Sequence, residues 1–346
     1  MINAGGTTMK CFVTGATGHI GNVLVKRLFE LGHSVDALVL KGDDYQMIEP
    51  YANLKFGDIT DRNYLTETVK GYDIVYHLAG VVEIRVGRKK QLYKINVEGT
   101  KNLLDACSHN RITKFLYVSS VHAIKETPKG SLIKEPDILN PGFVKGHYAK
   151  TKAIATDLVL NYPDKALKTI VVYPSGIIGP YDYKLSNFGQ VFVDHLIDRL
   201  PAYVEGGYNF VDVRDAAEGI ISASLKGRDR QDYILSGHNI SVKELLDKIS
   251  LFEGKKIIKT KIATWFMKTM SYFAEMYYAI MKRTPLFTHY SIAVLNSNYN
   301  FDCEKARREL NFKTRDIDSS IIDTIEFLKV NFLVKSKNKY RMKLTN

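Results

Sequence analysis

The sequence predicts an α/β fold in which a doubly wound parallel sheet carries a smaller, mainly helical C-terminal lobe. Strand-like and helix-like segments alternate over the first half of the chain, which is typical of right-handed βαβ units and a parallel sheet. A glycine-rich stretch, TGATGHIG (14–21), stands at the first strand–helix junction. The second half has longer spacing between its elements and more aromatic side chains.

The composition indicates a globular protein with a large buried core. The chain has 346 residues, of which 45% are hydrophobic and 25% charged, as in ordinary soluble proteins. Its three cysteines, Cys11, Cys107 and Cys303, form no CxxC pair, so we expect neither a zinc site nor a disulfide framework. We therefore expect a reducing, cytoplasmic setting and no bound metal.

The two ends of the chain are expected to be flexible. The first ten residues lack the apolar segment of a signal peptide, and Met9 is a candidate for the natural start. The net charge is +12, and the last twelve residues hold five Lys or Arg and no acid. This tail is either a solvated end or a segment attracted to an anionic membrane surface. Because basic and aromatic residues do not interleave, we expect no nucleic-acid partner.

Hydrophobic runs and helical periodicity place the elements of the first half. Ile20, Leu24, Leu28 and Leu31 share one helical face, and Gly32 ends that helix. We expect helices over 20–31, 61–70 and 96–110, and strands over 10–14, 34–40, 54–58, 73–80, 114–120 and 169–176.

The aromatic run WFMKTMSYFAEMYYAIM (265–281) needs separate treatment. It has 17 residues and includes Lys268 and Glu275, so it is too short and too charged to span a bilayer. Five apolar residues recur on one helical face, which favours core packing or a substrate lid over contact along a membrane surface. These residues are Phe266, Met270, Phe273, Tyr277 and Ile280.

The glycine spacing in TGATGHIG is that of a phosphate cradle. Gly15 permits the tight turn, Gly18 lets a pyrophosphate approach the backbone, and Gly21 lets the helix pack closely on the strand. Backbone N–H groups and the positive end of the helix then receive the negative charge. A simple tight turn is the alternative, but the strand–turn–helix context predicts a Rossmann-type dinucleotide site.

The domain boundaries follow from this placement. Residues 9–180 are expected to form the Rossmann domain, with a returning strand and helix near 208–226. The substrate-binding lobe is expected over 181–207 and 227–333, and flexible termini over 1–8 and 334–346.

The identity of the dinucleotide depends on the residues after the second strand. An acid at its end would bind the 2′-OH of the NAD ribose, but Lys41 follows two apolar residues there. Lys41 favours the 2′-phosphate of NADP, while Asp43 or Asp44 could still reach the ribose, so NAD stays open and the preference for NADP is slight. Asp58 and Ile59 are expected to bracket the adenine, and a helix cap is another role for Asp58.

A Tyr–Lys pair carries the predicted chemistry. Tyr148 and Lys152 in YAKTK stand one helical turn apart, so they share a face. A free tyrosine has a pKa of about 10, and a neighbouring ammonium would lower it. Such a pair is a tuned proton donor or acceptor, whereas a surface helix face is the simpler explanation. The motif VSS (118–120) ends the preceding strand and offers a hydroxyl for a carbonyl oxygen.

The order of these motifs resembles that of extended short-chain dehydrogenases/reductases, the epimerase/dehydratase superfamily. TGATGHIG, GDITD, YHLAG, NVEGT, YVSS, YAKTK, YPSGIIGP and FVDVRDAA stand in that order over roughly residues 9–330. Within the superfamily, the sequence is most similar to the dihydroflavonol 4-reductase and 3β-hydroxysteroid dehydrogenase branch. Many members of this branch carry Arg where this chain has Leu40, a departure that puts the NADP preference in doubt.

The resemblance implies Ser120, Tyr148 and Lys152 as the catalytic trio of an NAD(P)-dependent reductase or dehydrogenase. Ser120 would orient a carbonyl oxygen, Tyr148 would supply the proton, and Lys152 would tune Tyr148 and contact the nicotinamide ribose. The substrate is expected to be a hydrophobic ketone, steroid or flavonoid-like molecule. Contacts to the coenzyme are expected at Gly15, Thr17, Gly18, His19, Ile20, Gly21, Lys41, Asp58, Ile59, Leu78, Ala79, Gly80, Asn96, Tyr148, Lys152, Pro174, Gly176 and Ile177.

Two other functions share part of this pattern. A nucleotide-sugar epimerase or dehydratase with tightly bound NAD would use the same trio. Many such enzymes carry an Arg for the sugar-nucleotide phosphates where this chain has Tyr208 and Asn209, which counts against a diphosphate substrate. A sensor that reads NAD(P) without chemistry typically lacks the Tyr or the Lys, and this chain has both.

The remaining candidate residues have weaker support. His77 is expected to be a satisfied core histidine, and His122 either faces the site or is structural. The cluster Arg85, Arg88, Lys89 and Lys90 is either solvated or lies over the coenzyme phosphates. Helices 96–110 and 148–161 are expected to form a homodimer, as is usual in the family. Substrate contacts are expected at Val82, Phe143, Ser175, Phe188 and Tyr203, with Glu83 and Pro174 as further candidates.

Overall fold

The structure, a computed structural model, describes residues 8–82, 89–263, 265–267, 269, 293–336 and 339–343. Its main sheet has seven strands in the order β10-β6-β5-β4-β1-β2-β3, all of them parallel. This confirms the predicted α/β class and doubly wound parallel sheet. The strands of this sheet are β1 (Lys10–Thr14), β2 (Ser34–Val39), β3 (Asn53–Phe56), β4 (Ile74–His77), β5 (Lys114–Val118), β6 (Lys168–Pro174) and β10 (Gln231–Leu235).

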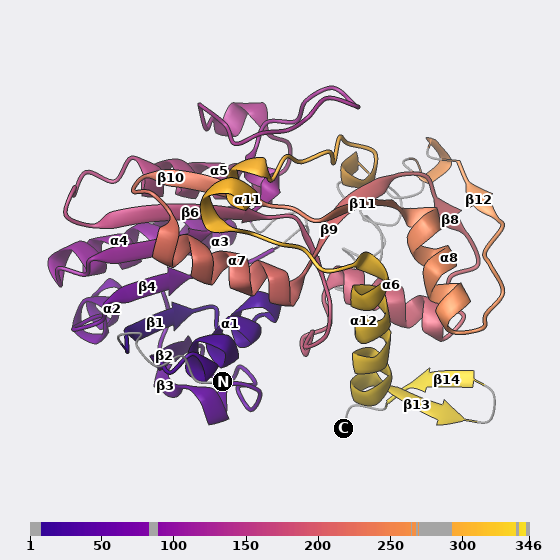
Figure 1. Cartoon of the computed structure of the whole chain (residues 1–346), viewed down its shortest axis with the longest axis horizontal. Helices are drawn as coiled ribbons and strands as arrows, with labels where there is room; N and C mark the ends of the chain where they lie inside the picture. The colour runs from indigo at the N-terminus through magenta and orange to yellow at the C-terminus, as the bar shows by residue number, and fades with distance from the viewer. Residues whose placement is uncertain are drawn as a thin grey trace.

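Helices cover both faces of the main sheet because alternate residues of each strand point to opposite faces. In β1, Cys11 and Val13 enter one hydrophobic core, and Phe12 enters the other. The first core lies against α1 (His19–Glu30), α7 (Val213–Lys226) and α11 (Glu304–Leu310). The second lies against α2 (Arg62–Thr68), α4 (Gly99–His109) and α5 (His147–Leu160). Figure 1 shows this layered part in its left half.

The helix predicted over 96–110 begins earlier in the structure. It is preceded by α3 (Lys89–Tyr93) and by a π-helical turn, η2 (Lys94–Glu98), before α4 starts at Gly99. Gly99 lies against Ile59, since a Cβ on this glycine would come within 2.7 Å of the Ile59 side chain. Short 3₁₀ turns occur at η1 (Glu49–Tyr51), η3 (Val121–Ala123) and η4 (Pro141–Phe143).

The second half builds smaller sheets around a third core. A three-stranded sheet has the order β11-β9-β7, and two-stranded sheets are formed by β12 with β8 and by β13 with β14. Helices α6, α8 and α12 pack around the third core on the right of Figure 1, so the predicted helical C-terminal region is confirmed. These elements are β7 (Gly176–Ile178), α6 (Asn187–Leu196), β8 (Tyr203–Val204), β9 (Gly207–Asp212), β11 (His238–Ser241), α8 (Val242–Phe252), β12 (Lys261–Ile262), α12 (Ile317–Phe332), β13 (Leu333–Ser336) and β14 (Lys339–Met342).

The segment near 208–226 returns to the main sheet through its helix. Its strand, β9, pairs with β7 and β11 rather than with a strand of the main sheet. Its helix, α7, packs against α1, β5 and β6. The seventh strand of the main sheet is β10, which follows α7 and was not predicted. The division of the chain into the two predicted units stays a prediction.

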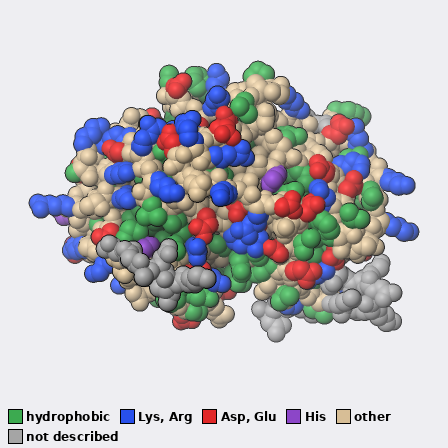
Figure 2. Space-filling view, viewed as in Figure 1, with side chains coloured by type: hydrophobic (Ala, Val, Ile, Leu, Met, Phe, Trp, Pro, Cys, Tyr) green, Lys and Arg blue, Asp and Glu red, His purple; other side chains and the backbone are tan. Residues whose placement is uncertain are grey.

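Most of the aromatic run 265–281 and part of the basic tail lie outside the described residues. Within the described part of the chain, no helix is long and apolar enough to cross a membrane. Trp265 and Phe266 are described, and their rings meet edge to face. Figure 2 shows Lys and Arg side chains interspersed with Asp and Glu over the face in view, so positive charge is not gathered into one patch there.

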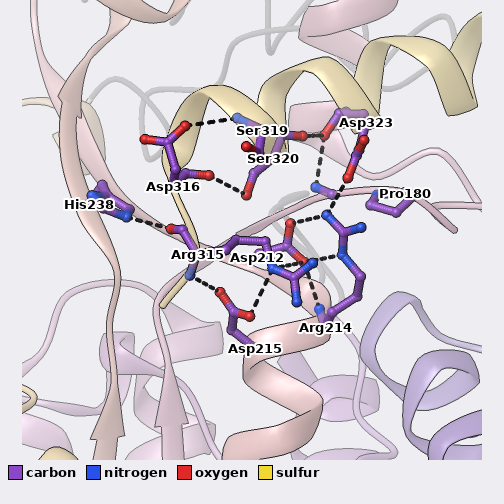
Figure 3. Close-up of polar contacts among 12 residues, drawn as sticks. Pro180, Asp212, Arg214, Asp215, His238, Arg315, Asp316, Ser319, Ser320 and Asp323 are labelled. Carbon is purple, nitrogen blue, oxygen red and sulfur yellow. Dashed lines mark hydrogen bonds and ion pairs between the residues drawn. The ribbon is translucent and has the colours of Figure 1, made fainter. Parts of the chain in front are cut away.

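An ion-pair cluster joins α7 to α12. The Asp212 carboxylate is fully buried and accepts two hydrogen bonds of 2.8 Å from the Arg214 guanidinium. Arg315 lies 3.7 Å from Asp212 and 2.9 Å from Asp215, and Arg214 also reaches Asp323 on α12 at 2.7 Å. Figure 3 shows these side chains converging on Asp212. Burial acts to raise the pKa of Asp212, but the hydrogen bonds from Arg214 bring it below its usual value.

We expect Asp212→Ala to destabilise the fold strongly because it leaves two arginines beside an empty buried position. Removing one partner of a buried pair costs about 3 kcal/mol. Asp323→Ala is the matched control, since the Asp323 side chain is 43% exposed and its loss should cost less than about 1 kcal/mol. Urea denaturation at pH 7 measures both free energies of unfolding. Equal losses in the two variants would contradict the central role of Asp212.

Candidate functional site

The glycine loop is shaped by close backbone contacts. Gly15 has a φ of +70°, and a Cβ on it would lie 2.6 Å from the Ala79 nitrogen. A Cβ on Gly21 would lie 2.1 Å from the Gly15 carbonyl oxygen. Both positions therefore require glycine, and β1, α1 and the end of β4 meet without intervening side chains.

This cradle fits the phosphates of a dinucleotide. Gly18 precedes the first residue of α1, and the first turn of that helix carries no acidic side chain, so its positive end is not neutralised from within. The expected residues Leu78, Ala79 and Gly80 follow β4 beside the loop. His19 and Ile20 open α1, where the His19 ring bonds the Pro180 carbonyl at 2.9 Å and Ile20 packs on the core.

Of the residues expected around the adenosine, two are exposed and one is buried. Lys41 is exposed in the turn after β2. Asp58 is exposed and accepts a hydrogen bond from the Thr60 nitrogen at 2.8 Å, while the cap of α2 is Asp61. The alternative role of Asp58 as a helix cap is therefore wrong. Ile59 is buried in the core beside Gly99.

Asp43, rather than Lys41, reaches the glycine loop. Its carboxylate accepts a hydrogen bond of 2.7 Å from the Thr17 hydroxyl. Lys184, from the distant loop between β7 and α6, donates to both Thr17 and Asp43 at 2.9 Å. Sequence reasoning did not single out Lys184, because 141 residues separate it from Asp43.

Asn96 ties the coenzyme side of the site to α5. Its side-chain oxygen accepts from the Val81 nitrogen at 2.8 Å, and its amide nitrogen donates to the Val81 carbonyl and to the Thr151 hydroxyl, each at 3.1 Å. Asn96 is 1% exposed. It thereby holds the backbone after β4 against the helix that carries Tyr148 and Lys152.

The three candidate catalytic side chains come together at the end of β5. Ser120 precedes η3, and its side chain lies near the Tyr148 phenol, whose pKa it acts to lower. The neighbouring Ser119 instead pairs with Thr156 on α5 at 2.6 Å. Only the second serine of the motif thus faces Tyr148. The Lys152 ammonium lies 3.5 Å from the position that a Cβ on Gly80 would take, which brings it beside the coenzyme loop.

The protonation of the pair differs from the sequence expectation. Burial raises the pKa of Tyr148 to about 12, and the Ser120 hydrogen bond opposes that rise only in part. Burial also lowers the pKa of Lys152 to about 7. The expected lowering of the Tyr148 pKa by Lys152 is not found, because the ammonium donates to the Val118 carbonyl at 2.9 Å and to the Tyr117 hydroxyl at 3.2 Å instead.

His77 is a fully buried core histidine, as expected. Its two ring nitrogens pair with the Thr14 hydroxyl at 2.7 Å and the Thr100 hydroxyl at 2.9 Å. The ring stacks on Tyr117 with 5.4 Å between centroids. Burial lowers the pKa of His77 to about 3, so the ring is neutral under Tyr117 and Lys152.

A cavity of about 110 Å³ is lined by Val121 and Ala149, the residues that follow Ser120 and Tyr148 in the chain. His122 lines it, with its ring edge toward Tyr148 at 6.1 Å between centroids and its Nε2 paired with the Tyr208 hydroxyl at 2.6 Å. His122 therefore faces the site, one of the two roles left open. The other lining residues are mainly apolar and aromatic: Val121, Ile124, Ile133, Val144, Ala149, Tyr208, Ala293, Val294, Tyr299 and Phe301, with Glu126, Lys145, Ser297 and Asn298.

None of the five predicted substrate contacts belongs to the cavity wall that the described residues form. Phe188 packs on Tyr208 at 5.3 Å between centroids. Val82 and Phe143 are exposed, and Tyr203 lies in β8. Ser175 stands between β6 and β7 with a buried hydroxyl that has no hydrogen-bond partner among the described residues.

The other expected contacts are placed as follows. Pro174, Gly176 and Ile177 flank Ser175 at the end of β6 and the start of β7. Glu83, Arg85 and Arg88 lie outside the described residues. Lys89 and Lys90 open α3 and are exposed. In the described part of the chain, no three His, Cys, Asp or Glu side chains gather as metal ligands would.

Comparison with known proteins gives a consistent result. Residues 11–235 match the NAD dependent epimerase/dehydratase family. The chain is 28% identical over 324 residues to sterol demethylase protein B of Methylococcus capsulatus, covering 93% of this chain and 98% of that protein. It is 29% identical to a putative dihydroflavonol 4-reductase of Synechocystis, covering 94% and 96%.

Further matches extend the pattern. A decarboxylating sterol-4-alpha-carboxylate 3-dehydrogenase of Dictyostelium discoideum is 25% identical, with 88% of this chain and 96% of that protein covered. The crystal structure of gox2253 superposes with a TM-score of 0.81 at 32% identity, covering 93% of this chain and 98% of that one.

The buried Lys152 predicts a pH-dependent stability. Its pKa of about 7 lies below the ordinary 10.4 of the unfolded chain, so the unfolded state binds more protons between these values. The contribution of Lys152 to stability therefore rises with pH above 7 and is lost as pH falls back to 7. Between pH 7 and pH 9, we expect the free energy of unfolding of the wild type to rise by about 2 kcal/mol more than that of Lys152→Met.

Urea denaturation at the two pH values measures this gain. Lys150→Met is the matched control, because Lys150 lies on the same helix and is exposed. A constant difference between wild type and Lys152→Met at pH 7 and pH 9 would show that the ammonium is not perturbed by burial.

Proposed function

The chain belongs to the NAD dependent epimerase/dehydratase family, and on this premise we propose that it interconverts a carbonyl and a secondary alcohol on a sterol-like molecule. The expected resemblance to dihydroflavonol reductases and sterol dehydrogenases is confirmed, as is the expectation of an oxidoreductase that uses a nicotinamide dinucleotide. The Ser-Tyr-Lys assignment and the substrate are the proposed parts.

The proximity of Ser120 to Tyr148, with a mainly apolar cavity lined by the residue that follows each of them, carries this proposal. A hydroxyl and a phenol that already face each other define one point where a substrate oxygen can be held by both. The Lys152 ammonium lies beside Gly80, which follows β4 next to the glycine loop.

The residues act on the substrate oxygen, while a bound nicotinamide would exchange hydride with its carbon. Because burial holds Tyr148 as a neutral phenol, it donates a proton to the oxygen during carbonyl reduction. Ser120 donates a hydrogen bond to the same oxygen and fixes its direction. Alcohol oxidation would run the same steps in reverse, from the phenolate form of Tyr148, which accepts the proton that the alcohol loses. Lys152 has a pKa of about 7, so its side chain is only partly protonated at neutral pH. Its protonated form is the cation nearest to Tyr148 on the same helix face.

The cavity lining and the relatives favour a sterol-like substrate. Tyr208, Tyr299 and Phe301 offer flat aromatic walls, and seven aliphatic side chains complete the apolar surface. The His122–Tyr208 pair is the polar group that faces the same space. Similar proteins are named for sterol demethylation and for oxidation of a sterol carboxylate at position 3.

We expect Tyr148→Phe to lower kcat at least about 100-fold, because the proton donor to the substrate oxygen is lost. The dissociation constant for the coenzyme should change less than twofold. Steady-state rates and calorimetric titration measure the two quantities. Tyr162→Phe is the control, since that hydroxyl bonds Asp105 away from the cavity. Full activity in Tyr148→Phe would overturn the assignment.

The substrate class is tested separately with the wild-type enzyme. We expect 3-oxo- and 3-hydroxysterols to be turned over with reduced or oxidised coenzyme, and UDP-sugars not to be isomerised. Coenzyme absorbance follows the first reaction, and chromatography of the sugar nucleotides follows the second. Isomerisation of a UDP-sugar with no sterol turnover would favour the epimerase alternative.

A further inference from the structure

Thr17, Asp43 and Lys184 form a three-membered contact, here called the loop clasp, over the glycine loop. The Thr17 hydroxyl donates to Asp43 at 2.7 Å, and the Lys184 ammonium donates to Thr17 and to Asp43, each at 2.9 Å. Thr17 is buried, whereas Asp43 and Lys184 are 29% and 45% exposed. The clasp thus lies where the coenzyme loop opens to solvent.

The clasp stands at the adenosine end of the proposed coenzyme site. Asp43 follows β2 after the turn that begins at Leu40 and comes 22 residues after Gly21. In Rossmann sites an acid about 20 residues beyond the glycines accepts from the ribose 2′-OH. Asp43 stands four residues beyond the end of β2, past the usual place of that acid, but its carboxylate contacts the glycine loop itself.

Lys184 is held in position by the loop that carries it. This loop, residues 179–186, is tied to α1 by the His19–Pro180 contact of 2.9 Å and by a 3.1 Å hydrogen bond from the Asn22 amide to the Tyr181 carbonyl. Tyr181 and Leu185, on either side of Lys184, have φ of +73° and +50°. Non-glycine residues take this conformation only where the surrounding structure holds it, as at ligand clamps.

The charges of the clasp decide which ribose it accepts. Burial acts to raise the pKa of Asp43, but hydrogen bonds from Lys184 and Thr17 bring it below its usual value, so the carboxylate is ionised at neutral pH. An ionised carboxylate alone accepts from a 2′-OH and repels a 2′-phosphate. The Lys184 ammonium can pair with either anion. Lys41, by contrast, is exposed and makes no hydrogen bond or ion pair with the glycine loop in the described part of the chain.

We propose that the clasp sets the coenzyme preference: Asp43 binds the ribose 2′-OH of NAD, and Lys184 pairs with the 2′-phosphate when NADP binds. Lys184 thus makes one site acceptable to both coenzymes. Lys184, which would bind the 2′-phosphate, lies in the loop 179–186, outside the β1–α1 unit that would bind the pyrophosphate. This inference rests on the coenzyme site of the proposed function.

Calorimetric titration of the full chain with NADH and with NADPH tests the clasp without turnover. Lys184→Met should weaken NADPH at least tenfold, about 1.4 kcal/mol, and change NADH less than twofold. Lys184→Arg should restore NADPH binding. Asp43→Asn should weaken NADH and tighten NADPH. Lys243→Met is the matched control, because its pair with Asp247 has the same exposure as Lys184 with Asp43 and lies on α8.

The other outcomes separate this inference from the function. If Lys184→Met weakens both coenzymes equally, or if Lys41→Met rather than Lys184→Met weakens NADPH, the role of the clasp is overturned while the coenzyme site stands. A wild-type chain that binds neither coenzyme would overturn the proposed function together with the clasp.

Discussion

The site depends on the absence of side chains where β1, α1 and β4 meet. Gly15 lies against the backbone of Ala79, and Gly21 lies against the carbonyl of Gly15, so a single added carbon would force two elements apart. The same junction extends inward through hydrogen bonds. Thr14 pairs with His77, His77 with Thr100, and Thr100 with the carbonyl of Asn96. Through this chain the coenzyme cradle fixes the residue that holds the catalytic helix.

Two buried charges show how stability and function differ in this protein. Asp212 is fully buried but has arginine partners on both sides, so its charge is compensated and it joins helices. Lys152 is also buried, yet carbonyl and hydroxyl oxygens surround it, with no carboxylate paired to it in the described chain. A charge held without an ionic partner destabilises the folded state. In the proposed mechanism, its position beside Gly80 and one turn from Tyr148 is the reason to retain it.

The sequence was sufficient where local patterns determine structure. Hydrophobic runs, helical periodicity and the glycine spacing located β1, α1 and the cradle, because close packing there allows few other residues. The strand β10 was missed because its sequence, QDYIL, begins with polar residues and carries no alternation. The Tyr148 pKa was misjudged because helical spacing gives proximity to Lys152 but not the direction of its hydrogen bonds. Burial, which the sequence does not show, outweighs that proximity.

Contacts between distant segments were beyond any local pattern, and the loop 179–186 is the clearest case. It leaves β7, which pairs with β9 in the small sheet, and then contacts α1 at His19 and Asn22. It next places Lys184 on the glycine loop and leads into α6 through the Ser186 cap. The small sheet also carries Tyr208, whose hydroxyl meets His122 at the substrate cavity. The pairing of β7 with β9 therefore connects the loop that contacts the glycine motif to the strand that carries Tyr208 in the cavity wall.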